Sequence, residues 1–270
     1  MSPALILAVY LALALVMAAA WWWQRRTRNI GWVDVFWTFG LAGAGVVLAF
    51  AAPLGEGSLA RRLLVCGLIL LWAVRLGLYV AFRVAGSPED GRYVAIRESW
   101  GDRLQPRMFW FLQLQAVVSI VLAVALGLAA NRPAPSLGPA DALGLLIALI
   151  AIGGESLADQ QMKAFRQDPA NKGKVCDIGL WGWSRHPNYL FEWLGWFAYP
   201  AMAVGLTGYP EGWLSLLAPL VMFGVLRFGT GVPPLEAHME RSRGDAFRAY
   251  QARVPVFLPR FRRQFLGVSR

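Results

Sequence analysis

The chain has 270 residues, of which 57% are apolar and 16% are charged, with 13 tryptophans and a net charge of +10. An average soluble domain carries roughly 25% charged residues, so this composition excludes a soluble globular domain, and it also excludes disordered, collagen-like and small disulfide-rich chains. The excess of basic residues would suit a nucleic-acid-binding protein, but their positions fit a membrane topology instead.

Apolar segments close to the length of a bilayer crossing recur along the chain. A hydrocarbon core of roughly 30 Å needs about 20 apolar residues in an α-helix, and only helices satisfy their own backbone groups in lipid at this length. We therefore predict an all-α fold: a polytopic membrane protein with a seven-transmembrane-helix bundle in a single membrane domain over residues 1–270. The predicted spans are 3–23, 30–52, 62–83, 108–130, 139–158, 190–206 and 213–229.

The first span ends in Trp21-Trp22-Trp23, followed by Arg25 and Arg26. This order is typical of an aromatic belt and a stop-transfer cluster, so we interpret the span as a retained helix rather than a cleaved signal peptide.

The basic residues fix the predicted orientation. Of the 26 lysines and arginines, 22 lie in four segments: 24–29, 83–107, 159–188 and the tail from 227. Cytoplasmic loops carry such an excess, so we predict an outside N-terminus and a cytoplasmic C-terminus. The expected location is an integral, multi-pass position in a membrane, the inner membrane if the source is bacterial. Membrane lipids are then the partners of the basic residues, and no nucleic acid is expected.

Ionisable residues inside the predicted spans are costly and usually functional. Asp34 lies near the cytoplasmic start of the second span, where it is interpreted either as an interfacial carboxylate or as a buried acid lining a cavity. Arg75, Tyr79 and Arg83 are spaced by four residues and form one polar stripe. Arg75 is too deep to reach water, so an internal partner such as Asp34 or Glu192 is expected.

The fifth span runs into a second polar face. Glu155, Asp159, Lys163 and Arg166 fall on one side of a helix. They form either a ladder of intrahelical ion pairs or one wall of a ligand site, in which the bases would hold phosphates.

The strongest local motif is the run Ser184-Arg185-His186-Pro187-Asn188-Tyr189, followed by Glu192. Ser184 and Pro187 suit a helix start, whose free N–H groups favour an anion next to Arg185. Asn188 and Glu192 are four residues apart, so both are expected to face one cavity. Farther on, Arg227 ends the last span.

The tail beyond Arg227 contains Glu236 and an amphipathic basic stretch over 243–253, which is interpreted as a helix on the membrane surface. Cys66 and Cys176 are not expected to form a disulfide, and neither the cysteines nor the two histidines have metal spacing, so no metal is expected. A Rossmann fingerprint following a strand and a P-loop are both absent from the sequence.

The run from Glu155 to Glu192 resembles the C-terminal domain of the steroid 5α-reductase superfamily, most closely its bacterial members long carried as a domain of unknown function. The resemblance spans about residues 30–260 and includes Gly31-Trp32-Val33-Asp34, Glu89 to Tyr93 and Val254 to Pro259. It implies a membrane reductase that binds NADPH and delivers a hydride to the C4–C5 double bond of a 3-oxo-4-ene steroid or a similar flat lipid enone.

The resemblance also implies roles for individual residues. Residues 30–130 would form the lipid side and residues 139–260 the cofactor region. The candidate catalytic residues are Asp34, Tyr79 and Tyr93. The family's catalytic tyrosine position is occupied by Trp72 here, which leaves the proton donor open between Tyr79 and Tyr93. The candidate cofactor-binding residues are Arg83, Asp159, Lys163, Arg166, Arg185, Asn188, Glu192, Arg227 and Glu236.

Two other functions stay open at this point. The Arg-His-Pro motif followed by a tyrosine and a glutamate is also similar to membrane methyltransferases of the isoprenylcysteine type, which bind S-adenosylmethionine. A non-catalytic lipid-binding membrane protein is the second alternative.

Overall fold

The computed structural model describes residues 1–51, 58–87, 89, 91–204 and 208–258, and all regular elements within these ranges are helices. The α-helices are α1 (Pro3–Thr27), α2 (Trp32–Ala49), α3 (Leu59–Gly86), α4 (Gly91–Trp100), α5 (Leu104–Ala130), α6 (Pro139–Gln167), α7 (Pro187–Gly195), α8 (Ala198–Ala203), α9 (Leu217–Phe228), α10 (Val232–Arg243) and α11 (Asp245–Arg253). The all-α prediction is confirmed.

Six helical stretches of the described chain are long and apolar enough to cross a membrane, which makes this a polytopic membrane protein. They are Pro3–Thr27, Trp32–Ala49, Leu59–Gly86, Tyr93–Ala130, Pro139–Gln167 and Pro210–Arg243. The predicted span 190–206, whose last two residues lie outside the described ranges, coincides with α7 and α8, which have nine and six residues. Neither is long enough to cross a bilayer alone.

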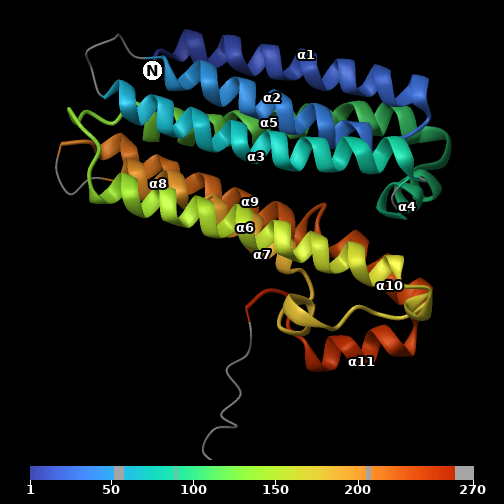
Figure 1. The fold of residues 1–270 in the computed structure, drawn as a ribbon. Helices are drawn as coiled ribbons and strands as arrows, with labels where there is room; N and C mark the ends of the chain where they lie inside the picture. The colour runs from blue at the N-terminus through green and yellow to red at the C-terminus, as the bar shows by residue number, and fades with distance from the viewer. Residues whose placement is uncertain (52–57, 88, 90, 205–207, 259–270) are drawn as a thin grey trace, which may run out of the picture.

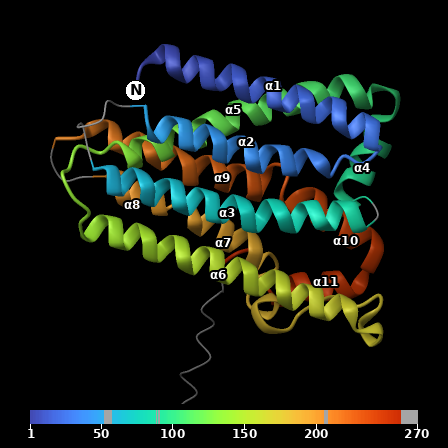
Figure 2. The same cartoon turned by 45° about the horizontal axis from the view of Figure 1, so that its top comes forward.

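The helices form two groups (Figures 1 and 2). α1, α2, α3 and α5 make one group, and α6 to α9 make the other, with α5 packing on α8 and α9. Small residues let neighbouring helices approach closely, as is common in membrane bundles. A Cβ at Gly45 of α2 would lie 2.5 Å from Leu126 of α5, so a larger residue there would force these helices apart.

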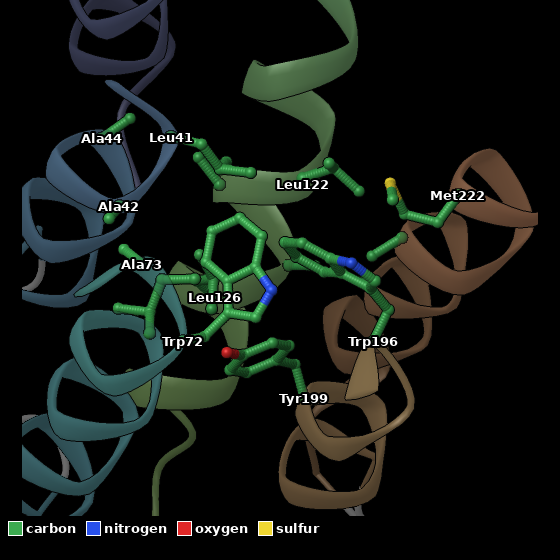
Figure 3. Close-up of a cluster of buried hydrophobic side chains, with 14 of the residues drawn as sticks. Leu41, Ala42, Ala44, Trp72, Ala73, Leu122, Leu126, Trp196, Tyr199 and Met222 are labelled. Atoms are coloured by element: carbon green, nitrogen blue, oxygen red, sulfur yellow. The ribbon is translucent and has the colours of Figure 1, made fainter. Parts of the chain in front are cut away.

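Aromatic side chains fill the centre between the two groups. Trp72 of α3 packs edge-to-face on Trp196 at a centroid distance of 5.8 Å, and Trp37 of α2 packs on Trp72 at 6.1 Å. Figure 3 shows Trp72, Trp196 and Tyr199 converging beside Leu126. These rings connect α3 across the core with Trp196, the residue directly after α7.

At the opposite end from α4 and α10, a buried ion pair ties α3 to α6. Arg61 is fully buried, binds Asp141 with Nε–Oδ1 at 2.7 Å, and donates to the carbonyls of Arg132, Ala134 and Ser136. The Arg61 guanidinium therefore satisfies three backbone carbonyls of the segment between α5 and α6 inside the protein.

The packing of α11 differs from the predicted membrane-surface helix in the tail. Phe247 and Tyr250 of α11 are each 3% exposed and pack with Val254 against Val175 and Met239. The apolar face of α11 is therefore covered by the protein, and the prediction of a membrane-surface helix is wrong for this face. An amphipathic pattern shows that a face is covered and leaves open whether lipid or protein covers it.

Candidate functional site

A cavity of about 560 Å³ is lined by residues of both helix groups and of α4 and α10. Its volume is in the range typical of small-molecule sites. Helices α2, α3, α6, α7 and α10 contribute to its wall, together with the loop 168–186. The eight predicted site residues on this wall are Asp34, Tyr79, Arg83, Asp159, Arg166, Arg185, Asn188 and Glu192.

Asp34 and Tyr93, both predicted as catalytic, are in direct contact. The Tyr93 hydroxyl donates to Asp34 Oδ1 at 2.7 Å, while the Thr38 hydroxyl donates to the Asp34 carbonyl at 2.8 Å. Asp34 lines the cavity, whereas Tyr93 is 5% exposed and lies behind the wall. Tyr93 therefore orients Asp34 and does not face the cavity itself.

Tyr79 lies on the wall between two guanidinium groups of its own helix. The Arg75 and Arg83 guanidinium carbons are each 5.9 Å from the Tyr79 ring centroid. The spacing of four residues on α3 predicts this arrangement, because such residues stack on one helix face.

Arg75 connects α3 to α6. It forms ion pairs with Glu155 at 2.7 Å and with Asp159, and its Nε donates to Ser156 at 3.1 Å. Arg75 therefore has internal partners, as expected, but they are Glu155 and Asp159 of α6 and not the suggested Asp34 or Glu192. The acidic residues of α6 thus pair across helices with Arg75, in place of an intrahelical ladder.

Glu192 is a buried residue of the cavity wall that binds two tryptophans. Trp72 Nε1 donates to its Oε2 at 2.7 Å, and Trp196 Nε1 donates to its Oε1 at 2.9 Å. Asn188, one turn earlier on α7, lines the same cavity. The i,i+4 spacing of Asn188 and Glu192 is therefore matched by a shared cavity.

Glu236 of α10 connects the segment before α7 with α11. Its Oε1 binds Arg185 Nε and His186 Nε2, both at 2.8 Å, and Gln251 of α11 donates to Oε2 at 3.1 Å. The buried Tyr250 hydroxyl donates to the Trp181 carbonyl at 2.6 Å, and burial raises the pKa of that hydroxyl. Glu236 thus supports the cavity wall from outside and does not line it.

His186 is buried, and burial lowers its pKa despite the opposing effect of Glu236. The neutral ring donates from Nε2 to the Glu236 carboxylate, which leaves Nδ1 as an acceptor. Nδ1 is buried and has no hydrogen-bond partner among the described residues, although His186 is part of the cavity wall.

We expect acidification to destabilise the protein through His186. Below the ordinary histidine pKa of about 6.5, the unfolded chain binds a proton at His186 that the folded chain does not. The stability that neutral His186 contributes is therefore fully present above this pH and is lost as the pH falls below it. The melting temperature in detergent should therefore drop between pH 7.5 and 5.5, and His186→Gln should flatten the drop. His238→Gln is the matched control, and an equal flattening by both variants contradicts the assignment.

Four predicted site residues lie off the cavity wall: Tyr93, Lys163, Arg227 and Glu236. Lys163 is exposed, and Arg227 stacks on Phe228 at 5.1 Å. Lys174, His238 and Arg243 are among the wall residues that the sequence analysis did not assign to the site. Lys174 lies in a loop, whereas His238 and Arg243 lie on α10. Basic residues are common near a membrane, so only their position in the fold distinguishes these three.

Comparison with known proteins places the chain in a family. A family described as "Protein of unknown function (DUF1295)" matches residues 20–254. The chain belongs to the DUF1295 family. An uncharacterized protein of Schizosaccharomyces pombe, C594.04c, is 27% identical over 267 residues, covering 89% of this chain and 75% of that protein. No solved structure matches the chain. The DUF1295 match includes every residue described above as lining or supporting the cavity.

Proposed function

We propose that this DUF1295 protein is an NADPH-dependent reductase that transfers a hydride to the double bond of a steroid-like or other flat lipid enone. The proposal rests on the observation that one cavity wall holds residues of both predicted parts of the site, the lipid side and the cofactor side. Asp34 and Tyr79 come from the predicted lipid side, and Asp159 and Asn188 from the predicted cofactor side. The resemblance to the steroid 5α-reductase superfamily supplies the reaction class.

The chemistry of the wall fits a dinucleotide phosphate. Arg166, Lys174 and Arg243 bring positive charge to the cavity, where phosphates would be held. Arg243 Nε is buried without a hydrogen-bond partner in the described part of the chain, as is His186 Nδ1. A buried unpaired donor and a buried unpaired acceptor on one cavity wall suit a polar ligand that supplies both partners.

When bound, the reduced nicotinamide would supply the hydride. The protein's own contribution begins at Asp34, which Tyr93 holds in place. In its protonated form, the Asp34 carboxyl donates a hydrogen bond to the ketone oxygen and stabilises the enolate oxyanion that forms as the β-carbon accepts the hydride. Tyr79 is the wall hydroxyl that delivers the proton to the α-carbon. The aromatic core around Trp37 and Trp72 keeps water out.

The proposed topology has seven crossings. We assign the sixth to α7 and α8 together, since both pack along α6. The N-terminus is then outside and the C-terminus cytoplasmic. This orientation places the basic wall residues Arg166, Lys174 and Arg243 on the cytosolic side.

The first test is thermal stabilisation of the purified protein. NADPH at about 100 times its dissociation constant should add about 2.7 kcal/mol of stability, and S-adenosylmethionine should add none. Membranes incubated with progesterone and NADPH should then yield a product heavier by two hydrogens. Stabilisation by S-adenosylmethionine alone would favour the methyltransferase, and stabilisation by neither ligand would favour a non-catalytic protein.

A further inference from the structure

The carboxylate of Glu192 is fixed at both oxygens by two indoles. Trp72 lies 120 residues away in sequence and reaches it from α3, whereas Trp196 follows directly after the last residue of α7. Glu192 is 8% exposed, and the exposures of Trp72 and Trp196 are 7% and 3%. This arrangement of Glu192, Trp72 and Trp196 is called the indole clamp below.

The donors in the indole clamp have a single chemical role. An indole N–H donates and cannot accept, whereas an ionised carboxylate accepts at both oxygens. Protonation of Glu192 would direct its O–H away from both indoles and weaken one of two charge-assisted hydrogen bonds. The clamp therefore favours the ionised form of Glu192, while burial of the group opposes it.

The charged residues next to the indole clamp form ion pairs with one another. Arg75 faces it from α3 and is paired with Glu155 and Asp159 of α6, and Tyr199 faces it from α8. This region holds three carboxyl groups around one guanidinium. Glu155 and Asp159 disfavour a charge on Glu192, whereas Arg75 and the two indole donors favour it.

We propose that Trp72 and Trp196 are positioning residues that hold Glu192 as an acceptor-only carboxylate, which selects a ligand group with N–H or O–H donors. Glu192 is part of the cavity wall, so a ligand amide or hydroxyl can approach it there. Trp72 occupies the position that the resemblance gives to a tyrosine, and its role here is to hold Glu192. The clamp itself stands without the proposed function, which supplies only the identity of the ligand.

Infrared difference spectroscopy tests the clamp without any ligand. The full-length protein in nanodiscs is compared with Trp72→Phe, Trp196→Phe and the control Trp193→Phe, which loses an equivalent indole bond to the Pro219 carbonyl at 3.0 Å. The carbonyl band of a protonated Glu192, assigned with Glu192→Gln, should be absent at pH 7 in the wild type and the control. It should appear in both clamp variants. A Glu192 acid band in the wild type, or no band in both clamp variants, overturns the inference.

NADPH binding gives a second readout. Trp72→Phe should weaken binding roughly tenfold at pH 7, the loss typical of a hydrogen bond to a charged group, and the affinity should recover as the pH rises and Glu192 ionises. A loss that is the same at every pH would indicate a merely structural role and overturn the positioning role. If the wild type fails to bind NADPH, the proposed function fails, and the infrared result alone decides the clamp.

Discussion

Replacing Arg75 with alanine is expected to lower the free energy of unfolding by about 3–5 kcal/mol, the cost typical of removing one partner from a buried ion pair. The side chains of Arg75, Glu155 and Asp159 are 15%, 7% and 13% exposed, so the substitution would leave two largely buried carboxylates without their cation. The melting temperature in detergent should fall by about 6–10 °C, at roughly 2 °C per kcal/mol for a chain of this size.

The matched control is Arg97→Ala, which breaks the ion pair with Glu89. Arg97 is 40% exposed, so its loss should cost only about 0–1 kcal/mol. Combining Arg75→Ala with Glu155→Gln and Asp159→Asn should restore part of the lost stability, because no unpaired carboxylate is left. If Arg75→Ala and Arg97→Ala melt at the same temperature, the buried network contributes little and the interpretation of Arg75 fails.

The sequence could predict the membrane class and most of the helices, because segment length and apolar content decide which segments can cross lipid. It could not predict that the span 190–206 would divide into α7 and α8. Residues 196 and 197 separate the two helices although the backbone of both keeps dihedral angles in the helical region, so local sequence gives no clear signal of the break.

The same distinction applies to the candidate site. The helical period places Asn188 and Glu192 on one face, and the structure brings both to one cavity with Asp159. The partner of Arg75 could not be predicted, because periodicity shows which residues share a face and does not show which helix lies opposite. The contact between Trp72 and Glu192 likewise exists only once α3 and α7 have packed together.

Asp34→Ala is expected to lower enone turnover by about 10²–10³-fold, the loss typical of removing one donor to a developing oxyanion. Asp34 lines the cavity, so the substitution also leaves the hydroxyl of Tyr93 without the acceptor that it contacts at 2.7 Å. NADPH should still raise the melting temperature, because the proposed phosphate-binding residues Arg166, Lys174 and Arg243 lie on other elements.

Tyr93→Phe separates orientation from chemistry in this pair. The Asp34 carboxyl remains, but it loses the hydrogen bond that orients it, so turnover should fall by about tenfold, which corresponds to roughly 1.4 kcal/mol in the barrier. Product is measured by mass spectrometry at saturating NADPH, with ligand stabilisation recorded on the same samples. Turnover of Asp34→Ala close to that of the wild type would remove Asp34 from the mechanism. A larger loss for Tyr93→Phe than for Asp34→Ala would instead make the Tyr93 hydroxyl the donor to the substrate, with Asp34 in the orienting role.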